Sequence, residues 1–97
     1  MTVFYLVFEV RPSRLNHTHV GGAYVHCWIR RDSDDAIADH LAARLEAEGW
    51  AVVSWSQPAP VQREELLADE DALEAFDMAM RDGEALQLHS WIFEGDD

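Results

Sequence analysis

Two histidines and their aromatic neighbours are the residues of this sequence best suited to chemistry. His26 lies in the stretch GGAYVHCWIRR and His89 lies in ALQLHSWIF. Each stretch is expected to be a β-strand in which alternate residues share a face, and both imidazoles fall on the polar, aromatic side. With Tyr24 and Glu9 nearby, they have the proton donors and acceptors of an acid–base site. The favoured interpretation is a structural one, two histidines hydrogen-bonded within an interface between copies of the chain.

A second pair of histidines, His17 and His19, lies in a stretch typical of a loop, RPSRLNHTHV at 11–20. These two residues are the candidates for metal ligands. A zinc site needs three or four ligands at recognisable spacing, and the sequence offers neither CxxC nor HExxH. We therefore expect no metal and no cofactor.

The remaining reactive side chain is Cys27, the one cysteine of the sequence, so no intramolecular disulfide can form. It falls on the apolar side of its strand, which predicts a buried and unreactive thiol. The sequence also has no GxxxxGK, GxGxxG or GxSxG motif. No catalytic residue is predicted, and a non-enzymatic role is favoured over an enzymatic one.

The charge is strongly negative, with 19 acidic residues against 7 arginines and a formal net charge of -12. Such a chain is a poor partner for nucleic acid and for anionic membranes, because both bind through cationic side chains. A basic protein partner is compatible with it, as is a simply soluble surface. The sequence has no apolar run of about 18 residues and does not open on a signal-like segment, so a cytoplasmic location is expected.

The predicted strand at 21–31 separates its residues into two kinds of face. Its odd positions are small or aliphatic and suit a core: Ala23, Val25, Cys27 and Ile29. Its even positions have an apolar body and a polar end: Tyr24, His26, Trp28 and Arg30. The first strand, 3–10, is similar, with an apolar set at Phe4, Leu6, Phe8 and Val10.

Two amphipathic helices and two further strands follow. The first helix is predicted from a cap at Asp32 or Ser33, and Gly49 ends it. The segment 50–57 predicts a third strand. The prolines of Pro58-Ala59-Pro60 are expected to end this strand and to form an extended connector. A second, strongly acidic helix is expected from about Asp69 to Gly83, and a last strand at 85–93.

This order predicts one α+β domain over residues 1–97, with elements ββαβαβ. The predicted architecture is a ferredoxin-like two-layer sandwich, although the standard order of that fold is βαββαβ. Its four-stranded, mainly antiparallel sheet carries both helices on one face. Strand–helix–strand crossings are right-handed, so two crossings that wind in the same direction place their helices on the same side of the sheet. The order of the strands in the sheet stays open.

Two helices on one face leave the other face of the sheet bare. Alternation assigns six aromatic and imidazole residues to this face: Tyr5, Tyr24, His26, Trp28, His89 and Trp91. The third strand adds either Trp50 or Trp55. Contiguous apolar patches of this kind rarely stay exposed on a monomer, so this face is predicted to form a homodimer interface or a ligand platform.

The N-terminal strand ending in Arg11-Pro12, followed by GGAYV, His26 and the pair CW, resembles small bacterial proteins of unknown function. The similarity covers about the first third of the chain, and the Gly49-Trp50 junction is compatible with it. The resemblance implies no activity, and it brings over no catalytic residue.

Three hypotheses for function follow. The first is a non-enzymatic domain that self-associates, or binds another protein, through the aromatic and histidine face, with the loop at 11–20 and the acidic second helix as further contact surfaces. The second is a small-molecule-binding protein or enzyme with a site of His26, His89 and Tyr24 on the open face. The third is an acidic inhibitor, similar to an immunity protein, that blocks a basic partner.

Overall fold

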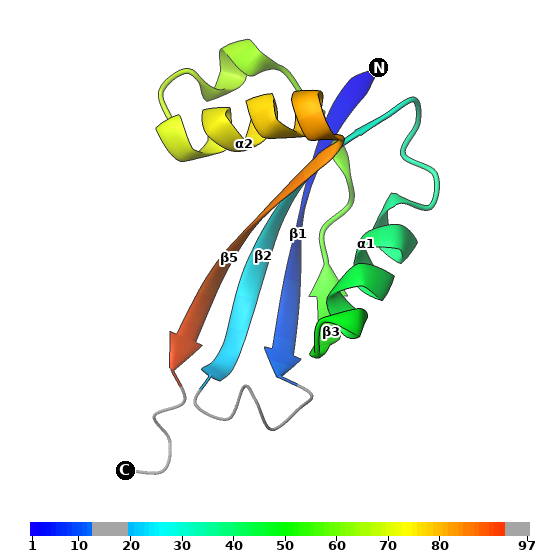
Figure 1. Ribbon diagram of the computed structural model, residues 1–97, viewed down its shortest axis with the longest axis vertical. Coiled ribbons are helices and arrows are strands. Elements are labelled where there is room, and N and C mark those ends of the chain that lie inside the picture. Colours follow the sequence, from blue (N-terminus) through cyan, green and yellow to red (C-terminus); the bar gives the residue numbers. More distant parts are fainter. Residues whose placement is uncertain (13–19, 93–97) are drawn as a thin grey trace.

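The computed structural model describes residues 1–12 and 20–92, and for Val20, Trp91 and Ile92 it describes the backbone alone. Figure 1 shows the arrangement of the elements. In chain order they are β1 (Thr2–Pro12), β2 (Val20–Arg31), α1 (Ile37–Ala47), β3 (Trp50–Trp55), β4 (Ala59–Val61), a 3₁₀ turn (Arg63–Leu66), α2 (Glu70–Asp82) and β5 (Glu84–Ile92).

The sheet is antiparallel at every pairing, in the order β3-β1-β2-β5, with β4 also paired to β1. It has five strands, so the predicted four-stranded sheet and the order ββαβαβ are wrong, and the order is ββαββαβ. The additional strand is β4, in the segment predicted to be only an extended connector. Pro60 can lie opposite Phe4 because β4 is at the edge of the sheet, where a missing backbone N–H costs no ladder hydrogen bond.

The larger core lies between one face of the sheet and α1. The apolar positions predicted for β1 and β2 all lie on this face and are buried. Helix α1 contributes Ile37, Leu41 and Leu45, each at most 2% exposed. Their spacing of four residues puts them on one side of the helix.

Helix α2 covers the opposite face of the sheet, so the prediction of two helices on one face is wrong. Its buried residues Ala75, Phe76 and Ala79 pack with Val3 and Trp28 on the side of β1 and β2 that faces away from α1. The right-handed rule applies to α1, which joins β2 to the parallel strand β3. It does not apply to α2, because β4 and β5 run in opposite directions. Figure 1 shows α2 lying across the end of the sheet where β5 begins.

The helix ends follow the predictions in part. Asp69 caps α2, since its carboxylate accepts from the Ala72 N–H at 3.1 Å. Gly49 and Gly83 both have positive φ, as expected for glycines that end helices. The predicted cap of α1 at Asp32 or Ser33 is wrong: the residue before this helix is Ala36, which has a φ of 59° and no capping side chain.

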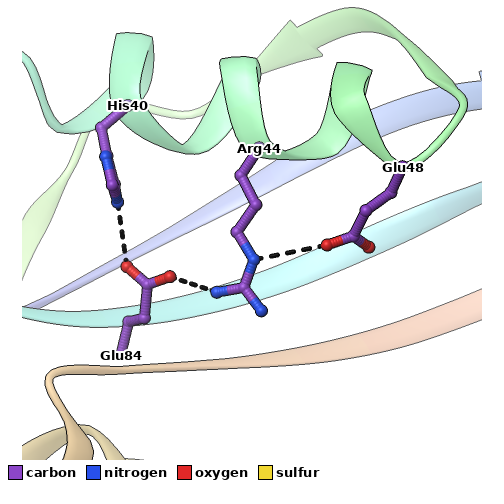
Figure 2. A network of polar contacts seen from close by, with 4 residues as sticks. All are labelled: His40, Arg44, Glu48 and Glu84. Carbon is purple, nitrogen blue, oxygen red and sulfur yellow. Dashed lines mark hydrogen bonds and ion pairs between the residues drawn. The ribbon is translucent and has the colours of Figure 1, made fainter.

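A polar network joins α1 to the beginning of β5. Figure 2 shows the Glu84 carboxylate between His40 and Arg44 of α1, with Arg44 also contacting Glu48. The Nε2 atom of His40 lies 3.0 Å from a Glu84 oxygen, and Arg44 donates a hydrogen bond to the other oxygen. In the part of the chain that the structure describes, no helix is long and apolar enough to span a membrane.

Candidate binding pocket under helix α2

An open pocket of about 370 Å³ lies where α2 stops covering the sheet. We call it the sheet–helix pocket. Its lining combines aromatic rings and imidazoles from the sheet with carboxylates and apolar side chains from the segment that enters α2. The lining residues are Tyr5, His26, Trp28, Val61, Leu66, Asp69, Asp71, Ala72, Gln87 and His89. A volume of this size falls within the range of small-molecule sites, about 300 to 1,000 Å³.

The register of the sheet brings the pocket's rings together. Tyr5 of β1 lies directly opposite Trp28 of β2, and their ring centroids are 5.0 Å apart. His26 is two residues before Trp28 on the same face, with its ring 5.9 Å from that of Tyr5. The three rings therefore form a continuous aromatic floor across β1 and β2.

A short hydrogen bond of 2.6 Å joins the Tyr5 hydroxyl to Nδ1 of His26. Partial burial, assisted by the negative charges of Cys27 and Asp69 when these groups ionise, raises the pKa of Tyr5. The phenol is thus protonated at neutral pH, and we assign it as the donor and Nδ1 as the acceptor. The imidazole proton of His26 then lies on Nε2.

The two histidines of the pocket meet edge to face. The rings of His26 and His89 are 5.1 Å apart, with an interplanar angle of 83°. Partial burial lowers the pKa of His26, and the neighbouring charge of protonated His89 lowers it further. His26 is therefore neutral at pH 7, and the pocket carries no fixed positive charge from it.

Trp28 is the deepest ring of the pocket, with 3% of its surface exposed. Its indole N–H is buried without a hydrogen-bond acceptor among the described residues. Buried indole N–H groups usually have a partner, and an unmet donor costs about 1–3 kcal/mol. The floor of the pocket thus holds a polar atom whose hydrogen-bonding capacity is unused.

The opposite wall comes from the start of α2. Asp69 and Asp71 are exposed and contribute carboxylates to the pocket. The Gln87 side chain donates a hydrogen bond of 2.8 Å to the backbone carbonyl of Asp71 and so fixes this wall against β5. None of the described residues that line the pocket is an arginine or a lysine. The formal charge of the pocket is consequently negative.

Four of the six residues predicted for the aromatic face, Tyr5, His26, Trp28 and His89, come together in this pocket. His26 and His89, which alternation assigned to one face, lie on the neighbouring strands β2 and β5 with their rings 5.1 Å apart. The hydrogen-bond partner of His26 is Tyr5, whereas Tyr24 and Glu9 were the neighbours expected.

The other two predicted face residues differ in position. Tyr24 lies on the same face beyond the pocket, opposite Glu9 and His89, and is 47% exposed. The Trp91 side chain lies outside the described residues, as do His17 and His19. Among the described residues, this face is exposed at the end that carries Tyr24, whereas α2 buries Trp28.

The pocket also contains residues that the sequence did not predict as site residues. Asp69, Asp71 and Ala72 enter because α2 begins over this face, and Val61 enters from the unpredicted strand β4. The capping position of Asp69 was visible in the sequence, but the face that α2 covers was not. Gln87 lines the pocket because it lies opposite His26 and two residues before His89 on the same face of β5.

The described residues contain neither a cluster of metal-ligating side chains nor a reactive thiol. Among the described residues, no three His, Cys, Asp or Glu side chains gather closely enough to hold a metal ion. Burial, with a further contribution from the charge of Glu84, raises the pKa of Cys27 to about 12. This thiol is fully buried, so it remains protonated and unreactive at neutral pH.

Comparison with protein-family models, with curated proteins and with solved structures gave no match. The geometry of the chain itself is therefore the basis for assigning a function.

Proposed function

We propose that the protein binds a small organic molecule in the sheet–helix pocket. The observation that carries this proposal is the convergence of two aromatic side chains, two imidazoles and two carboxylates on one concave site. Sites for small molecules typically combine such an apolar lining with a few polar groups that fix the orientation of the ligand.

Binding without chemistry is the form of this proposal that the geometry favours. The Tyr5–His26 pair is a proton donor and acceptor, but no serine, threonine, cysteine or lysine nucleophile is among the described residues that line the pocket. The Cys27 side chain is on the other face, packed in the core with α1. We therefore assign the polar groups to ligand orientation.

A fragment titration tests the proposal. Small molecules that are neutral, cationic or anionic are titrated into the ¹⁵N-labelled protein, and the chemical shifts of the Trp28 indole N–H and the pocket backbone are followed. Saturable shifts confined to the pocket are expected for at least one compound class. Their absence for every class would contradict the proposal.

A matched pair of variants locates the binding. His89→Trp fills the rim of the pocket with a larger ring at an exposed position, so its effect on stability is expected to be small. Ser90→Trp adds the same ring at the next residue, which is also exposed and lies on the opposite face of β5. Binding is expected to weaken in His89→Trp and to be retained in Ser90→Trp. Equal binding in both variants would move the site elsewhere.

Self-association is a second candidate, supported by the exposed end of the α2 face. Tyr24 is 47% exposed, and the neighbouring strand β5 lies at the edge of the sheet. Exposed edge strands pair readily with a second chain. Sedimentation velocity over a concentration series is expected to show a dimer that Tyr24→Ser weakens and Val53→Ser, at another exposed apolar position, does not. A concentration-independent monomer would exclude this candidate.

A further inference from the structure

We infer that the ligand of the sheet–helix pocket is an organic cation with an alkylammonium head group. This inference rests on the proposed binding function and adds the chemical class of the ligand. It rests on three features of one cavity, which are its aromatic rings, its carboxylates and the lack of an arginine or lysine among its described lining residues.

The aromatic floor is the first part of the argument. Tyr5 and Trp28 are adjacent, tilted rings whose centroids lie 5.0 Å apart in the wall of the cavity. The electron-rich faces of such rings attract cations, and alkylammonium groups are well suited because they are weakly hydrated. A cation in the cavity would contact this floor mainly through Tyr5, since Trp28 is only 3% exposed.

The carboxylates are the second part. Asp69 and Asp71 lie at the rim of the same cavity, across from the rings. The Asp69 carboxylate already accepts a hydrogen bond from its own helix through one oxygen, and Asp71 has no cationic partner among the pocket residues. A cation between rings and carboxylates would gain attraction from both.

An anionic ligand is the alternative that the start of a helix would ordinarily suggest, since helix N-termini attract negative charge. Here the first turn of α2 already carries Glu70 and Asp71, with Asp69 as its cap. An incoming anion would meet the two carboxylates of the pocket and a neutral His26, with the charge of Glu70 close by. The electrostatics of the pocket therefore select against an anion.

The buried indole N–H of Trp28 points independently to a ligand and adds detail to its structure. This donor has no acceptor among the described residues, although its ring forms part of the cavity wall. A hydroxyl or carbonyl oxygen near the head group would supply one after a small movement of the ring. Choline, which combines a quaternary ammonium with a hydroxyl, is thus a suitable probe.

Calorimetric or NMR titration with choline tests the inference against its uncharged carbon isostere, in which carbon replaces the quaternary nitrogen. Choline is expected to bind at least about tenfold more tightly. Equal affinity for both would overturn the cation inference and leave the binding pocket in place. Failure of both probes, together with every fragment above, would remove the pocket function itself.

Two sets of variants identify the groups responsible. Asp71→Asn is expected to weaken choline binding about three- to tenfold, and Glu70→Gln, which removes the same charge from a neighbouring residue outside the pocket, less than about twofold. Tyr5→Leu is expected to weaken binding by a similar factor, and Tyr5→Phe, which keeps a ring but loses the hydrogen bond to His26, by a smaller factor. Equal effects of Asp71→Asn and Glu70→Gln would show that the net negative charge of the region, and not a contact with Asp71, attracts the cation. Unchanged binding in Tyr5→Leu would contradict the proposed contact between the cation and the Tyr5 ring.

The same head group occurs on free small molecules and on methylated lysine side chains. A short peptide containing trimethyl-lysine therefore forms a separate arm of the titration. Tighter binding of choline than of the peptide indicates a free ligand, and the reverse indicates a protein-borne one. Binding of either probe supports a cationic ligand. If neutral fragments bind but neither choline nor the peptide does, the cation inference is refuted.

Discussion

The Tyr5–His26 hydrogen bond has consequences for the behaviour of single residues in the pocket. If the phenol donates to Nδ1, the proton of His26 is fixed on Nε2 by an interaction 2.6 Å long. The same bond holds the Tyr5 ring at its place in the aromatic floor. The pair therefore sets both the protonation and the shape of the site.

Replacing Tyr5 by Phe tests this assignment. The variant is expected to lose about 1 kcal/mol of stability, the usual contribution of one such hydrogen bond. The ¹⁵N shifts of the His26 ring are expected to show a smaller population of the Nε2–H tautomer than in the parent. An unchanged tautomer population would mean that another group orients the imidazole.

The titration of His26 predicts a dependence of stability on pH. Burial and His89 lower the pKa of His26 below 6.5, so the folded state binds the proton less well than the unfolded state. The stability from the neutral ring is complete above about pH 6.5 and is lost as the pH falls through the lowered pKa. The groups that face this ring are Tyr5 on β1, His89 on β5, and Asp69 and Asp71 across the pocket.

Urea unfolding at about pH 7.5 and pH 5.5 measures this effect. The parent is expected to lose more stability between these values than His26→Gln, which has no titratable ring. The affinity for a cation is expected to fall as His26 takes up its proton, because the protonated imidazole repels a cation. A parent and a variant with the same pH dependence would contradict the prediction.

Individual elements show which features were predictable. The alternation of Phe4, Leu6, Phe8 and Val10 correctly predicted the buried face of β1, because period two is a direct property of a strand. The same rule placed Tyr5, His26 and Trp28 together on the other face. Local spacing of this kind needs no knowledge of distant elements.

The location of α2 was not predictable in this way. Its apolar stripe indicates that it packs on a surface but does not specify which one, and no chirality rule selects the face when the helix joins antiparallel strands. The short strand β4 was also missed because Pro58 and Pro60 argue against a strand unless it lies at an edge. The Asp69 and Asp71 wall of the pocket depends on the position of α2, and its Val61 depends on β4.

The junction between α2 and β5 yields a prediction at the element scale. Gly83 has a φ of 103°, and a Cβ built at this position meets no atom within 4 Å. Gly83→Ala is therefore expected to destabilise the protein by about 1–2 kcal/mol through backbone strain alone. Chemical denaturation measures this change, and a loss below about 0.3 kcal/mol would show that the junction relaxes to negative φ.

At the scale of the whole molecule, the two cores differ in what they bury. The α1 core contains large side chains at nearly every position, whereas the α2 core contains four alanines among its seven buried residues. Less apolar area is thus expected to hold α2 than α1. Opening of α2 alone should cost less free energy than global unfolding.

Native-state hydrogen exchange tests this difference between the cores. Amides of α2 are expected to exchange through a partial opening, and those of β1 and β2 only through global unfolding. Leu41→Ala in the α1 core is expected to cost about 2–5 kcal/mol and to lower the protection of the whole sheet. Equal free energies of exchange for α2 and the sheet would indicate a single cooperative unit.

Strand β5 contacts both helices, although they lie on opposite faces of the sheet. Gln87 holds the first turn of α2, and three residues earlier Glu84 contacts His40 and Arg44 of α1. A displacement of α2 by an occupied pocket would pull on the same strand that anchors the other helix. The NMR resonances of the His40 ring, on the opposite face of the sheet, are then expected to shift when a ligand fills the pocket, although His40 does not contact the ligand.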